Sequence, residues 1–478
     1  MKTNHAQVEI NDLRDLIQLC EQMGELKRVK AEVDWNLELC HIAKRNEEQN
    51  GPALIFENVK GYKTPVLTSV FMKPKHVAMV FNMPLQSTIF DLAKKWISIT
   101  EKGGIPPKLV SNGPVMENIK TGDDVNLYEF PVPKYFPKDG GRYFGTSVCL
   151  ITKDPETGFV NLGTYRMEML DEKSLGALIL KGKDADITMK KYQARNELMP
   201  AAAVIGGDPR LFFLSACSIP YGVSEYDIAG ALRGKPVEVI ESDLTGLPIP
   251  AHAEIVAEGF IDPNPENYRD EGPFGEYTGY YSKGRMPRPW LDVKRILHRN
   301  NPIFWGTTVG RPPTTNVLIH SLAKTAALWE QLNQMKIPGI QSVYFHPAAG
   351  RFWAVISVKQ MYPGHARQAG LAAFATVVGN YGMKGVIVVD DDIRADDWDR
   401  VMWALSVRYN PVEDTEIIKK GRSTALDPSL PMGNRHICSR ILMDATIPYE
   451  WEDKPELVEM DEDMMKRVNE RWSEFGID

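Results

Sequence analysis

The chain has little cysteine and no long hydrophobic run. Its 478 residues include five cysteines, which are scattered and form no C-x-x-C pair. We therefore expect neither disulfides nor a structural zinc site, and a reducing cytoplasm fits this usage. The amino terminus has no apolar core of signal-peptide length, and no run of 18 apolar residues occurs. We accordingly expect no secretion and no membrane contact.

Basic runs are also lacking. The chain has 56 Lys and Arg against 63 Asp and Glu, which gives a net charge of −7. Such a balance disfavours binding to nucleic acid or to anionic membranes. The hydrophobic content of 43% and the charged content of 25% are those of an ordinary globular protein. At this length two or three domains are expected.

Several catalytic motifs are missing. No G-x-G-x-x-G follows a strand and opens a helix, and neither G-x4-G-K-[ST] nor G-x-S-x-G occurs. The nine histidines form no H-x-x-x-H doublet. These absences disfavour a nicotinamide dehydrogenase, a P-loop enzyme, a serine hydrolase and a classical zinc hydrolase.

The first part of the chain, residues 1–115, alternates helix and strand signals, which indicates an α/β domain. It ends where proline and glycine cluster around residues 103–107. The spacing of apolar residues predicts helices over 11–23, 37–46 and 89–100 and strands over 25–33, 53–56 and 65–70.

Residues 116–300 show a different sequence pattern, in which short runs rich in β-branched and aromatic residues alternate with Gly/Pro turns. This pattern is typical of a β-barrel-like domain. We expect strands over 145–152, 160–169, 212–216 and 237–241, with a helix inserted over 187–195.

Residues 301–478 return to α/β texture, with helices expected over 323–334 and 366–378 and strands over 352–358 and 384–389. The second strand ends in three consecutive aspartates, 390–392, which could bind a metal but more often form a solvated loop. Apolar residues repeat at helical spacing over 455–475. This terminal helix either packs on its own domain or forms contacts between copies in an oligomer.

The stretch over 271–280, Glu-Gly-Pro-Phe-Gly-Glu-Tyr-Thr-Gly-Tyr, places two carboxylates five residues apart on a backbone of turns. Its glycines permit unusual dihedral angles and the close approach of a neighbour. Two neighbouring acids, Glu271 and Glu276, suit proton transfer because proximity separates their pKa values. A solvated turn with surface acids is the alternative reading.

A second stretch, Asn-Leu-Gly-Thr-Tyr-Arg over 161–166, supplies an amide and a guanidinium to match these acids. Together with Val-Ile-Gly-Gly-Asp-Pro (204–209), Gly-Val-Ser-Glu-Tyr-Asp (222–227), the 271–276 acids and Leu-Asp-Pro-Ser-Leu-Pro (426–431), it resembles the UbiD family of decarboxylases. The resemblance covers nearly the whole chain. It implies an α/β fold with a central, flavin-reductase-like split β-barrel.

The resemblance also implies a bound prenylated flavin mononucleotide and a divalent ion, Mn²⁺ or Mg²⁺, with K⁺ possible alongside. Oxygen ligands suit such hard ions, which in turn suit phosphate. The implied metal ligands are Asn161, Asp184 and Glu225. Asp184 stands where the family has a histidine, so Asp186 and Lys183 are alternatives, and a surface acid is the plain reading of Asp184.

By the same resemblance, Arg166, Glu271 and Glu276 match the catalytic Glu-Arg-Glu network. Glu276 would deliver the proton, while Arg166 would bind the substrate carboxylate and keep Glu271 ionised. A purely structural ion pair between Arg166 and Glu271 is the alternative. Further residues expected at the cofactor are Thr164, Tyr165, Ser215, Cys217 and Arg367, with Asn161, Arg166 and Glu225.

Substrate contacts are expected from Asn316 and His320, although a lone histidine among apolar residues is often part of a core. An amide and an imidazole would suit a phenolic hydroxyl, a ring heteroatom or a second carboxylate. We therefore expect a hydroxybenzoate-type or heteroaromatic acid as substrate, with the loop over 421–433 as a mobile lid.

The resulting hypothesis is reversible, non-oxidative decarboxylation of an aromatic, heteroaromatic or α,β-unsaturated acid. A flavin prenyltransferase would supply the cofactor, and the protein would be a homo-oligomer, a dimer or hexamer. Two alternatives remain open: an FMN-dependent reductase and a non-catalytic subunit of a multi-subunit carboxylase.

Overall fold

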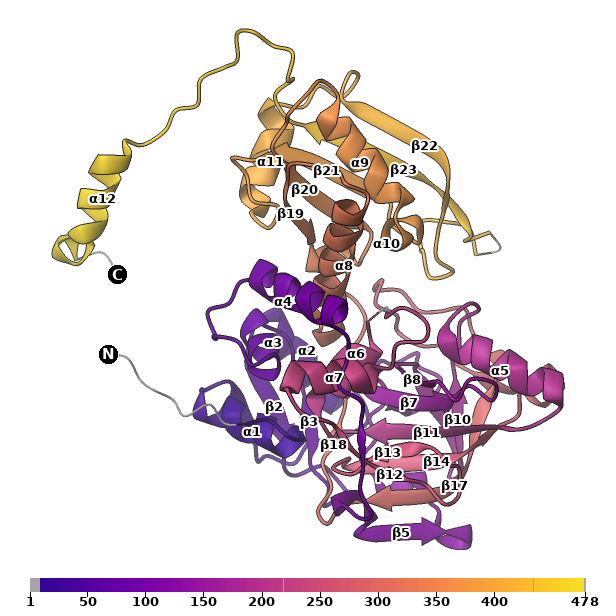
Figure 1. Ribbon diagram of the computed structural model, residues 1–478. Helices are drawn as coiled ribbons and strands as arrows, with labels where there is room; N and C mark the ends of the chain where they lie inside the picture. Colours follow the sequence, from indigo (N-terminus) through magenta and orange to yellow (C-terminus); the bar gives the residue numbers. More distant parts are fainter. Residues whose placement is uncertain (1–8, 218, 433, 477–478) are drawn as a thin grey trace.

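The computed structural model describes residues 9–217, 219–432 and 434–476. The chain forms three regions in sequence order (Figure 1). The first and the central region lie side by side, and the third lies above them. Helices α4 (Ile89–Lys102) and α8 (Thr315–Gln334) pack against each other where the third region meets the first.

The first region is built on a four-stranded sheet in the order β1-β2-β3-β18. Asp12 caps its first helix by accepting hydrogen bonds from the backbone N–H groups of Arg14 and Asp15, and the helix buries its leucine stripe. Strand β18 pairs in parallel with β3, so the chain returns to this sheet after the central region. The elements are α1 (Leu13–Gln22), β1 (Leu26–Val29), α2 (Glu38–Glu48), β2 (Ala53–Phe56), β3 (Val66–Thr68), α3 (Pro74–Val80), α4 and β18 (Phe304–Trp305).

The central region contains a nine-stranded sheet in the order β6-β9-β10-β17-β14-β11-β7-β8, with β5 paired to β17. Within the described residues β6 and β8 are hydrogen-bonded on one side only, so the sheet is curled but open. The expected mixed α/β content is present, whereas the expected flavin-reductase-like split barrel is not confirmed by the described residues. The strands are β5 (Asn118–Thr121), β6 (Tyr143–Gly145), β7 (Val148–Lys153), β8 (Val160–Gly163), β9 (Met167–Asp171), β10 (Ser174–Ala177), β11 (Met199–Ile205), β14 (Ile255–Ile261) and β17 (Trp290–His298).

Three helices, α5 (Asp184–Arg195), α6 (Pro209–Ser215) and α7 (Glu225–Arg233), pack at the β7–β8 end of this sheet. The strand predicted over 212–216 was wrong, because most of that run lies in α6. Asp208 caps this helix and Pro209 occupies its first turn, a pattern that starts a helix even in an aromatic-rich run. The small strands are β4 (Lys108–Leu109), β12 (Glu238–Glu241), β13 (Pro248–Pro250), β15 (Arg269–Glu271) and β16 (Met286–Arg288).

The third region is a five-stranded sheet in the order β19-β20-β21-β23-β22, with α9 packed on its central strands. Asp390 and Asp392, from the aspartate run, both pair with Arg408, which agrees with a structural loop. The elements are α8, β19 (Ile340–Phe345), β20 (Trp353–Val358), α9 (His365–Ala375), α10 (Val377–Asn380), β21 (Gly385–Asp390), α11 (Trp398–Val407), β22 (Thr415–Arg422) and β23 (Ile437–Ala445).

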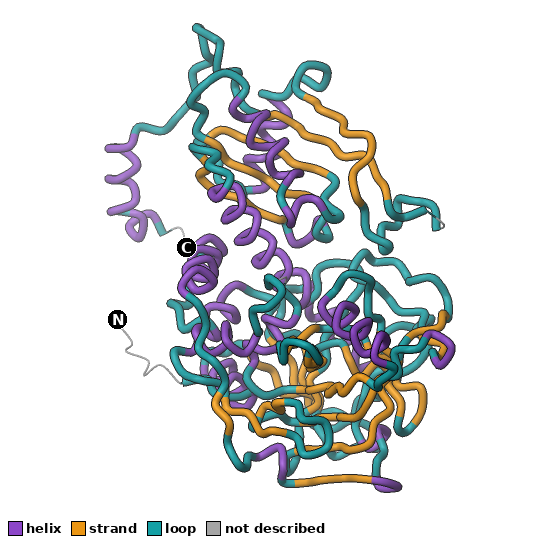
Figure 2. The backbone as a smooth tube through the Cα atoms, turned by 45° about the vertical axis from the view of Figure 1, so that its right-hand side comes forward, coloured by secondary structure: helices purple, strands orange, loops and turns teal. Residues whose placement is uncertain are grey.

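The chain then leaves the third region as an extended arm that ends in α12 (Glu462–Glu470). The observed helix is therefore shorter than the helix predicted over 455–475. In Figure 2 the same arm and helix stand apart from the sheets. No residue of α12 is buried.

None of the helices in the described residues combines the length and apolar character that a transbilayer segment requires. All five cysteines lie in the described ranges and are free thiols, as the sequence predicted.

Candidate active site

Arg166 lies between the two glutamates of the 271–280 stretch. Its Nε and Nη2 donate to the two carboxylate oxygens of Glu271 at 2.8 Å each, and its Nη1 contacts Glu276. The three side chains are at most 9% exposed, so this is a desolvated network. Burial opposes the charge of Arg166, but Glu276 and Glu271 outweigh it and raise the pKa of Arg166. Burial also raises the pKa of Glu276, and the neighbouring Glu271 adds to the shift.

The glycines shape the loop that joins the two acids. Gly272 follows Glu271 with a φ of +91°, a left-handed conformation that favours glycine. A Cβ on Gly275 would lie 2.5 Å from the ring of Phe136. This loop is therefore built for turning and close packing, as the sequence indicated, and Glu276 is held at a fixed place beside Arg166.

Two further buried acids, missed by the sequence analysis, hold this loop by its backbone. Glu168 accepts a hydrogen bond from the Gly272 N–H at 2.6 Å, and Asp139 accepts one from the Gly275 N–H at 3.0 Å. Burial raises the pKa of Glu168 to about 7 and that of Asp139 to about 6. Tyr143 completes the arrangement by donating to Glu271 at 3.1 Å.

Asn161, Asp184 and Glu225 converge from three elements. Asn161 lies on β8, while Asp184 and Glu225 are the first residues of α5 and α7. The Asn161 Nδ2 lies 3.4 Å from Asp184 Oδ2 and 3.3 Å from Glu225 Oε1. The second oxygen of Glu225 accepts from the Leu162 N–H at 2.8 Å, which fixes its orientation.

This trio fits a divalent cation. The Asn161 Oδ1 is buried without a hydrogen-bond partner in the described residues, and turning the amide would present that oxygen to the two carboxylates. Burial raises the pKa of Asp184, and it raises that of Glu225 to about 8 with a contribution from Asp184. A cation between the carboxylates of Asp184 and Glu225 would stabilise their charged forms and so lower both pKa values. The described residues contain no cluster of three His, Cys, Asp or Glu suited to a metal, and this trio differs from such a cluster in that one of its members is an amide.

The predicted cofactor residues Thr164, Ser215 and Cys217 lie next to this trio. The hydroxyls of Thr164 and Ser215 are 2.6 Å apart, and the Thr164 N–H donates to the Ser215 carbonyl at 2.9 Å. The Cys217 thiol donates to the Phe213 carbonyl at 3.1 Å. Tyr165 accepts from the Ala185 N–H at 3.4 Å, directly beside Asp184.

Asn316 and His320 lie on α8 and are not among the residues that line the cavity described below. His320 is half-buried near Arg351, Lys324 and Lys183. Burial, and then Arg351, lower its pKa well below the ordinary value, so the ring is neutral. The sequence analysis missed Arg351, whose guanidinium carbon lies 4.0 Å from the centre of the Tyr277 ring. Arg351 also interacts electrostatically with Glu276.

The structure does not bring Arg367 to these residues. Its Nη2 donates to the Glu413 carbonyl at 2.6 Å, and its Nε lies 3.4 Å from Glu416. Both partners belong to the third region, where α9 meets the start of β22. The guanidinium is thus committed to local contacts in that region.

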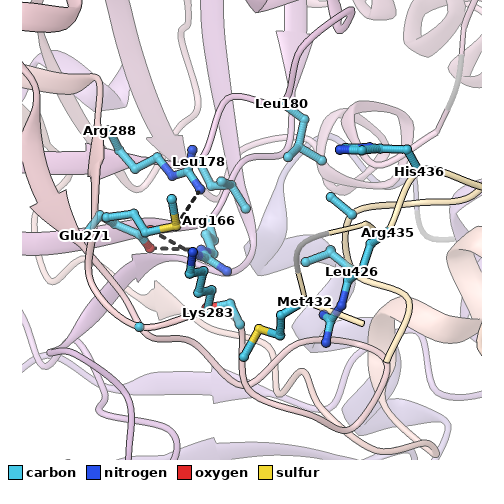
Figure 3. Close-up of a pocket in the computed structure, with 14 residues that line it drawn as sticks. Arg166, Leu178, Leu180, Glu271, Lys283, Arg288, Leu426, Met432, Arg435 and His436 are labelled. Carbon is cyan, nitrogen blue, oxygen red and sulfur yellow. Dashed lines mark hydrogen bonds and ion pairs between the residues drawn. The ribbon is translucent and has the colours of Figure 1, made fainter. Parts of the chain in front are cut away.

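A cavity of about 190 Å³ opens beside Arg166 and Glu271, between the central and third regions (Figure 3). The residues of the third region that line it lie within 425–436, so this side comes largely from the loop predicted as a lid. Its lining residues are Arg166, Leu178, Leu180, Glu271, Ser282, Lys283, Gly284, Met286, Arg288, Ala425, Leu426, Met432, Arg435 and His436.

Three family models cover most of the chain. They describe the N-terminal, Rift-related and C-terminal domains of 3-octaprenyl-4-hydroxybenzoate carboxy-lyase and match residues 17–96, 108–312 and 317–445. The fold and these matches define a carboxy-lyase. The chain belongs to the UbiD family of decarboxylases.

Solved structures agree. The UbiD-class enzyme HmfF from Pelotomaculum thermopropionicum, in complex with FMN, is 30% identical with a TM-score of 0.86, over 96% of this chain and 99% of that one. Vanillic acid decarboxylase from Sedimentibacter hydroxybenzoicus in open form is 31% identical with a TM-score of 0.86, over 97% and 98%. The 3,4-dihydroxybenzoic acid decarboxylase of Enterobacter cloacae, 24% identical with a TM-score of 0.82 over 96% and 100%, shares the fold.

The raised pKa of Glu168 predicts a pH-dependent contribution to stability. Because the folded-state pKa of about 7 exceeds the ordinary 4.5, the contribution is present below about pH 4.5 and is lost as pH rises through 7. Glu168→Gln keeps an acceptor for Gly272 without the charge. We expect the variant to gain thermal stability relative to wild type by a few degrees between pH 5 and pH 8, measured by calorimetry. A pH-independent difference would contradict this account.

Proposed function

We propose that the protein decarboxylates an aromatic, heteroaromatic or α,β-unsaturated carboxylic acid with prenylated FMN, and that Glu276 delivers the proton. The observation that carries the proposal is the buried Glu271–Arg166–Glu276 network at the edge of the cavity. In the net reaction the bond to the carboxylate breaks, CO2 leaves, and the same carbon takes a proton. When bound, the prenylated flavin supplies the electron sink that this bond cleavage needs.

The two glutamates have different roles because their partners differ. Glu271 receives two hydrogen bonds from Arg166 and one from Tyr143, so both of its carboxylate oxygens are occupied. Glu276 is buried, and its raised pKa favours the protonated form that can give a proton. Arg166 holds both acids in place, and Glu168 and Asp139 hold the loop between them.

Asn161, Asp184 and Glu225 would hold the divalent ion, Mn²⁺ or Mg²⁺, at the flavin phosphate, and K⁺ could accompany it. The N-termini of α5 and α7 meet here, and their backbone dipoles favour an anionic group. Thr164, Tyr165, Ser215 and Cys217 lie where they can contact the same cofactor. A flavin prenyltransferase is the implied supplier.

Glu276→Gln tests the proposed proton donor. The amide keeps the size and an acceptor for Arg166 but carries no acidic proton, so CO2 release should fall by about a hundredfold or more. The assay uses protein loaded with prenylated FMN and a panel of hydroxybenzoates, furoate and cinnamate. In wild type the rate should fall as pH rises through the raised pKa of Glu276.

Glu266→Gln, an exposed glutamate in the turn before β15, is the matched control and should retain full activity. Full activity in Glu276→Gln would refute its role. Hydride transfer from added nicotinamide that is indifferent to Glu276→Gln would instead favour an FMN reductase.

Asp184 and Asp186 are both candidate metal ligands, and their contacts distinguish them. Asp184 faces Asn161, whereas Asp186 accepts from the Gly182 N–H at 2.8 Å and pairs with Lys190. We expect Asp184→Asn to weaken Mn²⁺ binding at least tenfold, as measured by electron paramagnetic resonance, because a charged ligand is lost. Asp186→Asn should leave the affinity nearly unchanged, and the reverse pattern would reject Asp184 as the ligand.

We also propose that the terminal arm packs on a second copy of this chain. A helix of nine residues is marginal alone in water, and Met464 in α12 and Trp472 in the turn after it are about half exposed. An evolved form of HmfF is dimeric, so a related fold can assemble with itself. The proposed oligomer is either a dimer or a hexamer.

Removal of residues 455–478 should therefore lower the molar mass measured by light scattering, because the arm's contacts with the second copy are lost. Met464→Glu in the full chain should act in the same direction. An unchanged mass in both variants would show that the arm does not hold copies together.

A further inference from the structure

The cavity beside Glu271 is lined by more positive than negative charge. Its basic residues are Arg166, Lys283, Arg288 and Arg435, and its one carboxylate is Glu271. Arg166 is committed to Glu271 and Glu276. Three cations therefore remain, and none of them forms an ion pair with a carboxylate in the part of the chain that the structure describes.

These cations lie on two sides of the cavity. Figure 3 shows Arg288 and Lys283 on the side of Arg166 and Glu271, with Arg435 and His436 across from them. The Arg288 Nε is buried and has no hydrogen-bond partner among the described residues, and its Nη2 reaches only the Met286 sulfur at 3.9 Å. A half-buried guanidinium left without an ion-pair partner in this way favours an anionic ligand.

The space between the two sides has apolar walls. Leu178, Leu180 and Met286 come from the central region, and Leu426 and Met432 come from the third region. Such walls suit the flat body of an aromatic ring. Arg435 itself is held in place, since its Nε donates to the Leu430 carbonyl at 3.2 Å, which leaves its remaining N–H groups available.

We propose that the substrate carries two acidic groups, one held by Arg288 and Lys283 beside Glu271, and the second held by Arg435 across the cavity. This inference rests on the proposed function only in taking the cavity as the substrate site. A single carboxylate would leave cations on the far side without a partner, whereas a diacid would neutralise both sides. An aromatic dicarboxylate is the chemical class that matches the charges and the walls together.

Titration calorimetry with benzoate, benzene-1,3-dicarboxylate and benzene-1,4-dicarboxylate tests the proposal on flavin-loaded protein. Wild type should bind at least one diacid about tenfold or more tightly than benzoate. Arg435→Leu should weaken the diacid about tenfold and leave benzoate within about twofold. Arg288→Leu should weaken all three acids, because every one places a carboxylate at that side.

Two variants control for folding and for net charge. Arg435→Lys keeps the charge and should retain most of the diacid preference. Arg195→Leu, at the exposed end of α5, makes the same charge change away from the cavity and should bind like wild type.

Equal affinity of wild type for benzoate and both diacids would overturn the proposal, as would equal weakening of benzoate and diacid by Arg435→Leu. Loss of flavin with unchanged acid binding in the Arg288 and Arg435 variants would assign these cations to the cofactor and also overturn it. Because the readout is binding, an absence of CO2 release would count against the proposed reaction alone.

Discussion

The pairing of Arg166 with Glu271 and Glu276 is the interaction on which the rest of the site depends. Removing one partner of a buried ion pair leaves an uncompensated charge, which typically costs about 3–5 kcal/mol. Here Glu276, the third member of the network, is kept beside Arg166 by a loop whose backbone N–H groups are bound by Glu168 and Asp139. Chemistry and loop geometry are thus maintained by the same group of desolvated side chains.

The fold explains how residues distant in sequence come together. Asn161 on β8 and Arg166 directly before β9 are close in sequence, so the short segment between these two strands connects the metal trio to the acid network, although the strands pair with different neighbours. The N-termini of α5 and α7 bring Asp184 and Glu225 to Asn161 on β8. The third region then supplies Ala425, Leu426, Met432, Arg435 and His436 to the cavity, so the cavity is complete only when two regions of the chain meet.

Local signals in the sequence predicted much of this structure. Apolar spacing predicted α1, α4 and β2 close to their observed bounds. Ordered motifs pointed to Asn161, Arg166, Glu225, Glu271 and Glu276, which the fold brings into two adjoining groups. Other features depend on tertiary contacts that no local pattern reveals. Glu168 reads as an ordinary strand residue, and Arg288 matters only because its side chain faces a cavity formed by distant segments. The aromatic run over 212–216 looked like a strand, whereas the cap before it made a helix.

The central claim is that these residues serve a prenylated flavin in a decarboxylase. The most direct test is the intact mass and absorption spectrum of the cofactor retained by protein that is coproduced with a flavin prenyltransferase and Mn²⁺ and purified without oxygen. The account predicts a flavin heavier than FMN by one prenyl unit. Retention of plain FMN only, or of no flavin, would contradict it.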